Sequence, residues 1–205
     1  MHETALPPVW FRLPPGFHDI GPEDRASLDA VAHALGSPDA RQELAQLVDG
    51  LDELAGLGVV HTAIGLHPDE PVGVCTSLFS LSIRPTDEPN PRVAAARTAL
   101  GIARSAAWAA SARRFIDLPS SLPCYLVAGT INVPRAQQHV FQARIATSHP
   151  GGLHVLVLDV TSAATQHHGA YTEILEAIAL TLSFTDPDPS PPPAPRASRI
   201  LEVLL

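Results

Sequence analysis

The sequence contains no lysine, and all 13 of its basic residues are arginine, against 21 acidic residues. The formal net charge is -8 and the isoelectric point is about 5.6. A chain of this charge repels a phosphate backbone unless its basic residues gather on one surface, and no basic cluster stands out along the sequence. We therefore expect no nucleic-acid partner.

Cysteine is also scarce. Cys75 and Cys124 lie far apart, form no CxxC pair and both fall in strand-like stretches. Two buried free thiols fit a reducing compartment better than they fit a disulfide framework. The first residues lack the basic and apolar regions of a signal peptide, and the apolar runs fall short of the roughly 18 residues of a membrane span. These features predict a cytoplasmic protein without a membrane span.

Motifs that carry chemistry are missing as well. The sequence has no GxxxxGK[ST] loop, no GxGxxG between a strand and a helix, no GxSxG elbow and no HExxH pair. It therefore predicts no catalytic residue, no cofactor and no metal ligand, and favours a protein that is not an enzyme.

The ten histidines are the most suggestive residue type. His61 and His67 share one face of a predicted strand, and Cys75 on the neighbouring strand can approach them, which gives a conceivable metal site. Residues six positions apart along a strand are separated by about 20 Å, however, so one ion cannot bridge both histidines.

A catalytic alternative stays open. His167 and His168 precede the last predicted helix, where a histidine could act as a general base with Asp159, although a surface pair is the default interpretation. The rival to a binding protein is thus an enzyme or small-ligand protein with an unrecognised pocket, using His61, His67 or Asp159.

Two further groups have both a functional and a structural interpretation. The aromatic residues Trp10, Phe11, Phe17 and Trp108 either line a ligand pocket or belong to the core. The helix predicted after Ser37 is rich in acidic residues, which form either a docking face or a solvated surface.

Composition and periodicity predict the architecture. Hydrophobic residues make up 45% of the chain and charged residues 17%, which supports one domain over residues 1–185, followed by a tail over residues 186–205. Periodicity predicts a short edge element over 9–18, helices over 22–36, 38–56, 91–108 and about 166–184, and strands over 59–67, 72–86, 113–118, 122–133, 137–149 and 153–162. This order predicts an α+β fold in which a largely antiparallel β-sheet is flanked by helices, an α/β/α sandwich.

Apolar faces predict how these elements pack. The helix over 91–108 is expected to contact the sheet through a narrow stripe of Val93, Ala96, Leu100 and Ala103. The last helix carries apolar residues at helical spacing from Tyr171 onward. The strand over 153–162 is apolar on both faces, so we expect it at the centre of the sheet.

The tail has two parts. After Thr185 comes Asp-Pro-Asp-Pro-Ser-Pro-Pro-Pro-Ala-Pro, which predicts an extended, polyproline-like spacer. An apolar segment follows, and it either folds back on its own domain, binds a partner at a sheet edge or in a groove, or frays. The candidate partner-binding residues are Ile200, Leu201, Val203, Leu204 and Leu205.

The order of elements resembles a known superfamily. The Leu13-Pro14-Pro15-Gly16-Phe17 turn, the strand hairpin, the antiparallel strands and the closing Tyr-x-x-Ile-Leu-x-x-Ile helix resemble the PsbP-like α/β/α sandwich, which includes Mog-type and mycobacterial LpqN-type proteins. The opening Val-Trp-Phe-x-x-Pro-Pro-Gly-Phe segment is similar to that of actinobacterial proteins, and the arginine-only, alanine-rich and proline-rich composition is typical of a GC-rich genome. The resemblance implies a binding or assembly module and transfers no catalytic residue.

These observations favour a non-enzymatic adaptor or assembly module of a bacterial complex, such as a secretion- or toxin-related system, with a protein as its partner. A homo-oligomer, in which the tail of one subunit covers a sheet edge of the next, is a third hypothesis.

Overall fold

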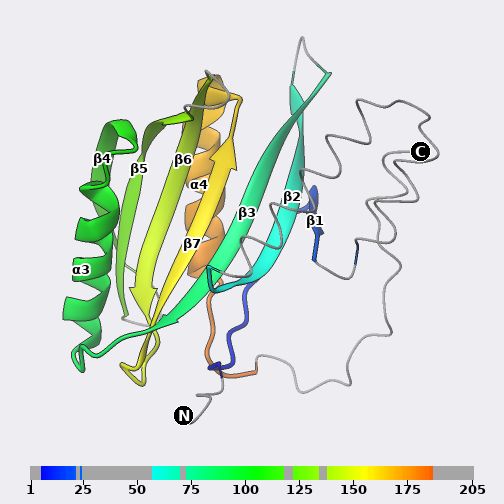
Figure 1. Cartoon of the computed structure of the whole chain (residues 1–205). Coiled ribbons are helices and arrows are strands. Elements are labelled where there is room, and N and C mark those ends of the chain that lie inside the picture. The colour runs from blue at the N-terminus through cyan, green and yellow to red at the C-terminus, as the bar shows by residue number, and fades with distance from the viewer. Residues whose placement is uncertain are drawn as a thin grey trace.

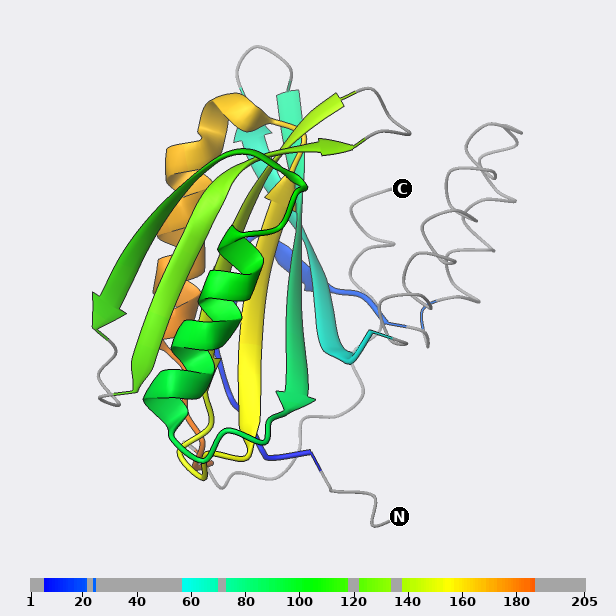
Figure 2. The same ribbon diagram turned by 60° about the vertical axis from the view of Figure 1, so that its left-hand side comes forward.

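Seven strands form one antiparallel sheet in the computed structural model of the chain, which describes residues 6–21, 24, 57–69, 73–117, 122–133 and 138–186. They lie in the order β1-β2-β3-β7-β6-β5-β4 (Figure 1). Their bounds are β1 Phe17–Asp19, β2 Val59–Asp69, β3 Gly73–Pro85, β4 Trp108–Asp117, β5 Pro123–Val133, β6 Gln138–Ser148 and β7 His154–Ser162. Helix α3 (Pro91–Ala103) covers one face, and α4 (His168–Leu180), which follows the 3-10 turn η2 (Thr165–His167), covers the other (Figure 2). Neither described helix is long and apolar enough to cross a membrane.

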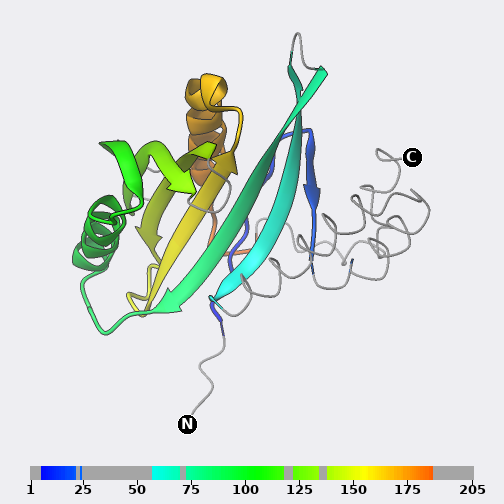
Figure 3. The same ribbon diagram turned by 45° about the horizontal axis from the view of Figure 1, so that its top comes forward.

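This arrangement confirms the predicted α+β fold with an antiparallel sheet between helices. The strand expected at the centre is central, because β7 lies between β3 and β6. The helices cover the half of the sheet formed by β4 to β7, and the β2–β3 hairpin extends to one side of it (Figure 3). The helices predicted over 22–36 and 38–56, with the acidic residues of the second, lie almost wholly outside the described residues. The tail residues that also lie outside them are Ile200, Leu201, Val203, Leu204 and Leu205.

The main core lies on the α4 side of the sheet. Strands β3 and β7 bury every second side chain there, as at Phe79 and Leu158, because alternate residues of a strand face the same side. Helix α4 packs Tyr171, Leu175 and Ile178 against them, and each is at most 1% exposed. The predicted apolar face of this helix is therefore confirmed, although the helix ends at Leu180.

Helix α3 packs through alanine, so the stripe predicted for it is wrong at its two largest members. Val93 is 39% exposed and Leu100 is 40% exposed. Small side chains let the helix approach β5 and β6 closely, which turns the branched residues outward. The buried residues of α3 are Ala94, Ala95, Ala99 and Ala103.

The segment after α3 also differs from its prediction. The helix ends at Ala103, and the indole Nε1 of Trp108, the first residue of β4, donates to the Ile102 carbonyl at 2.7 Å. The strand predicted over 113–118 is thus the second half of a ten-residue strand. Residues 106–112 are mostly alanine, a strong helix former, and pairing with β5 overrides that local preference.

Gly129 lets β4 lie close to β5. A Cβ at this position would collide with the carbonyl oxygen of Ala110 and would come within 2.8 Å of the Cα of Ser111. The pairing of the two strands shifts between Trp108 and Ala110, as at a β-bulge, which increases the local twist. The position of the sheet edge therefore depends on the missing side chain at residue 129.

We expect Gly129→Ala to lower the free energy of unfolding by about 2 kcal/mol, because the new methyl group forces β4 away from β5. Gly101→Ala on α3 is the matched control, since a Cβ there meets nothing within 4 Å. Alanine in a helix should raise stability by roughly 0.5–1 kcal/mol. Urea unfolding of both variants tests this, and a neutral Gly129→Ala would contradict the close approach.

Candidate functional site

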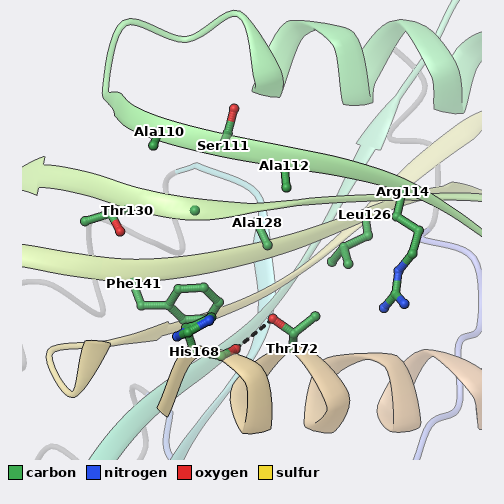
Figure 4. Close-up of a pocket in the computed structure, with 11 residues that line it drawn as sticks. Ala110, Ser111, Ala112, Arg114, Leu126, Ala128, Thr130, Phe141, His168 and Thr172 are labelled. Carbon is green, nitrogen blue, oxygen red and sulfur yellow. Dashed lines mark hydrogen bonds between the residues drawn. The ribbon is translucent and has the colours of Figure 1, made fainter. Parts of the chain in front are cut away.

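A groove lies between α4 and the two strands at the sheet edge, β4 and β5 (Figure 4). Its volume is about 640 Å³, and ligand pockets occupy roughly 300–1,000 Å³. Strand β4 contributes Ala110 and Ala112, and β5 contributes Ala128 and Gly129. We call this space the α4 groove.

The α4 groove exists because the side chains of Ala110, Ala112 and Ala128 are too small to reach α4. Leu126, two residues before Ala128 on β5, and Phe141 on β6 line the groove where it meets the main core, to which both belong. Figure 4 shows Ala112, Ala128 and Leu126 directed toward α4. The groove is thus a space that small side chains leave unfilled beside a closely packed core.

Few polar groups in the α4 groove are available to a ligand. Arg114 forms an ion pair with Glu176 of α4 and lies at one end of the groove. The Thr172 hydroxyl donates to the His168 carbonyl of its own helix at 2.8 Å (Figure 4). An occupant of this groove therefore gains mainly from the burial of apolar surface.

Apolar side chains are also exposed on the opposite face of the same edge. Val93 and Leu100 of α3 lie beside Tyr125 of β5, and Leu100 and Tyr125 also line a depression of about 240 Å³ with Phe115 of β4. Phe115 is 54% exposed, and its ring meets that of Tyr125 edge to face at 5.4 Å. We call Val93, Leu100, Phe115 and Tyr125 the α3 patch.

Strand β4 itself runs between the α4 groove and the α3 patch. It is an edge strand, and no other described segment pairs with its outer side. Ten residues long and free of proline, it presents a row of outward N–H and C=O groups, whereas the other edge strand, β1, has three residues. The geometry suits an added strand whose alternate side chains enter the groove and cover the patch.

The sequence did not predict this site, although one residue that lines the α4 groove, His168, was considered as a general base. None of the small residues belongs to a motif. The one available sign was the small-residue run Ala109-Ala110-Ser111-Ala112 leading into Phe115, and its helix-forming composition concealed a strand.

A polar cluster lines a second cavity, of about 330 Å³, on the α3 side of the sheet. The carboxylate of Asp159 accepts from Arg144 Nε at 2.5 Å, from Gln142 Nε2 at 3.0 Å and from the Thr161 hydroxyl at 2.7 Å. Burial raises the pKa of Asp159, and the Arg144 guanidinium opposes part of that rise. Because these partners occupy both carboxylate oxygens, the cluster has a structural rather than a catalytic geometry.

A second cluster lies on the α4 side, where β2 meets β3. His67 and Cys75 are cross-strand partners, in agreement with the expectation that Cys75 can approach His67. His67 Nε2 lies 2.8 Å from Ser77 Oγ, and Cys75 Sγ lies 3.2 Å from the Tyr171 hydroxyl oxygen. Burial, and secondly the nearby His167, lower the pKa of His67. Ser77 is 4% exposed, so its hydroxyl is closed to a substrate.

The structure separates the other candidate residues. His61 Nε2 lies 3.3 Å from Asp19 Oδ1, and His61 is six residues before His67 along the same strand, β2, so the two histidines do not meet. Asp159 is on the α3 side of the sheet and His168 is on the α4 side, so the two do not meet. Within the described part of the chain, no three His, Cys, Asp or Glu residues are grouped to hold a metal ion.

The four aromatic residues considered as a pocket do not converge either. Phe11 and Phe17 pack against the edge of the main core, and Trp108 packs on α3 against the other face. Trp10 pairs through its backbone with Ser183. These positions fit the structural interpretation of the aromatic group.

No family model and no curated protein match this chain. Among solved structures it is similar to LpqN of Mycobacterium tuberculosis, described as involved in cell envelope biogenesis, with a TM-score of 0.50 and 11% identity over 89% of this chain and 86% of LpqN. It is also similar to PA94 of Pseudomonas aeruginosa, a protein of unknown function, with a TM-score of 0.42 and 13% identity over 63% of this chain and 84% of PA94. The likeness to LpqN shows a shared fold, in agreement with the LpqN-like part of the sequence resemblance.

We expect Arg144→Leu to lower the free energy of unfolding by about 3 kcal/mol at neutral pH, because it leaves the buried Asp159 carboxylate without its cation. Burial already raises the folded-state pKa of Asp159 in the wild type, and without the Arg144 cation it rises further above the unfolded value. Stability is then lost as the pH rises between the two values and is recovered as the pH falls. Urea unfolding across pH measures the effect.

The control is Arg144→Leu combined with Asp159→Leu, which removes both charges and should cost less than Arg144→Leu alone. A penalty for Arg144→Leu that is independent of pH would show that the charge of Asp159 is not its cause.

In the native protein we expect one thiol, that of Cys75, to react with a disulfide reagent at pH 8. Cys124 is 0% exposed, and burial raises the pKa of its thiol to about 12, so almost no thiolate forms. Denaturant should add a second equivalent, and Cys75→Ser should leave none in the native state. Two native equivalents would contradict the burial of Cys124.

Proposed function

We propose that this protein is a non-enzymatic binding module that holds an extended, largely apolar segment of a partner protein at β4, as an adaptor or assembly factor of a bacterial complex. One observation carries the proposal: a long edge strand, unpaired among the described residues, lies between the α4 groove and the α3 patch. Recognition by strand addition uses main-chain hydrogen bonds for affinity and side-chain pockets for specificity.

The chemistry of the described polar residues supports binding rather than catalysis. The Ser77 hydroxyl next to His67 is buried, and the Asp159 carboxylate is bonded on both oxygens. An acyl-transfer or general-base site needs its reactive group within reach of a bound substrate. Neither group lines the α4 groove.

The biological setting is part of the proposal. LpqN, which shares the fold, is described as involved in cell envelope biogenesis, and this supports a role in building a bacterial structure. A secretion- or toxin-related system is the narrower hypothesis. Kinship with PsbP-like and Mog-type proteins and a cytoplasmic location stay predictions, the latter supported by two free thiols.

Ala112→Trp tests the proposal, because the indole fills the α4 groove from its own wall. Ala163→Trp, at an exposed position after β7, is the matched control. In pull-downs from the native host we expect wild type and Ala163→Trp to capture one common partner, and Ala112→Trp to capture at least about tenfold less, equivalent to about 1.4 kcal/mol. Equal capture by all three baits, or none above background with wild type, contradicts the proposal.

A small apolar ligand is the second candidate, because the volume of the α4 groove suits one. Native mass spectrometry of protein purified from its host distinguishes the two. A bound small molecule present in wild type and Ala163→Trp but absent from Ala112→Trp would favour this function over a protein partner.

A further inference from the structure

The two apolar surfaces beside β4 determine what kind of strand fits there. A strand added to this edge sends alternate side chains to opposite faces, one set into the α4 groove and the other onto the α3 patch. A surface strand with one solvated face is apolar only at every second residue. A strand that suits β4 is instead apolar at consecutive positions.

The chain contains such a segment. Residues 199–205 read Arg-Ile-Leu-Glu-Val-Leu-Leu, and the spacing of an extended strand divides them into two mostly apolar sets. One set is Arg199, Leu201, Val203 and Leu205, and the other is Ile200, Glu202 and Leu204. We propose that residues 199–205 add to β4 of their own molecule as a further strand. This inference rests on the proposed function, because it names the resident occupant of the same surface.

Near its end, the described chain passes the end of β6. It stops two residues after Phe184, whose ring lies 4.9 Å from that of His149, directly after the end of β6. Across the sheet, Thr147 of β6 pairs with Cys124 of β5, which pairs with Ile116 of β4. The end of β4 is therefore two strand spacings from β6, about 10 Å.

The spacer is long enough to cover that distance. Residues 186–195 include six prolines, and ten residues in a polyproline conformation span about 31 Å at roughly 3.1 Å each. A segment that arrives from this side meets the Asp117 end of β4 first and runs toward Trp108. It would thus lie antiparallel to β4, like every other pair in the described sheet.

Charge and tethering favour the tail over a second copy of the strand. Arg113 and Arg114 lie at the middle of β4, so a second copy of β4 would add two more cations to an edge where one arginine, Arg114, is already paired with Glu176. The tail instead brings Glu202 to this strand. The spacer also supplies its segment within the same molecule, so pairing with β4 needs no second molecule.

Occupancy by the tail regulates the site. A partner binds only those molecules whose β4 is free, so its apparent affinity is lowered by the fraction that is covered. A change that weakens the tail contact, while leaving β4 intact, therefore increases partner binding.

Val203→Asp in the full chain is the first test, with Ala197→Asp as the control of equal charge in the same tail. By hydrogen exchange we expect the β4 amides that point away from β5 to exchange at least about tenfold faster in Val203→Asp than in wild type or Ala197→Asp, with β7 unchanged. Partner capture should rise in Val203→Asp alone. Unchanged exchange at β4 overturns the inference.

Cross-linking decides which molecule supplies the strand. Two double variants in a Cys75→Ser background make the test. We expect a short bismaleimide to join the two new cysteines of Ala112→Cys/Val203→Cys within one monomer. It should not join those of the control, Ala163→Cys/Val203→Cys. A cross-linked dimer shows a strand exchanged between two copies and overturns the inference as stated. No cross-link, with capture still lost in Ala112→Trp, overturns it while the proposed function stands.

Discussion

Steric space at the border of β4 and β5 controls the site. Because residue 129 has no side chain, the backbone at Ala110 can approach it, and β4 completes the sheet. Ala112 and Ala128 then face α4 without reaching it, so the α4 groove opens beside a filled core. On the other face, alanines bring α3 close to β5 and β6 and turn Leu100 outward. Small residues therefore produce both apolar surfaces beside one edge.

The centre of the sheet gives this edge a rigid support. Strands β3, β7 and β6 bury Phe79, Leu158 and Ile145 beneath α4, each at 0% exposure. On the α3 side, Arg144 and Asp159 form a paired cluster whose desolvation is offset by its own hydrogen bonds. A binding surface built on packed strands loses little entropy when it is occupied, which suits a module that recognises an extended segment.

The parts of the fold in which apolar residues recur at regular spacing could be predicted from the sequence. The β2–β3 hairpin, central β7 and the apolar face of α4 follow from alternation or helical spacing, and even the neighbourhood of His67 and Cys75 was foreseeable. Residues 91–117 were not predictable in this way. Hydrophobicity ranks Leu100 above alanine for burial, but close approach to the sheet favoured alanine. The groove depends on missing volume between residues far apart in sequence, which no local pattern records.

An edge that recognises a strand through its backbone leaves little trace in side-chain identity. Every residue except proline supplies an N–H and a C=O, so β4 must avoid proline and stay small at Ala110 and Ala112, and few other constraints apply. The same property is a hazard, because a long edge flanked by apolar surfaces pairs readily with other molecules. A tethered strand of the same chain removes this hazard and keeps the site usable. It covers the edge at any protein concentration, and it is displaced by a partner that binds more tightly.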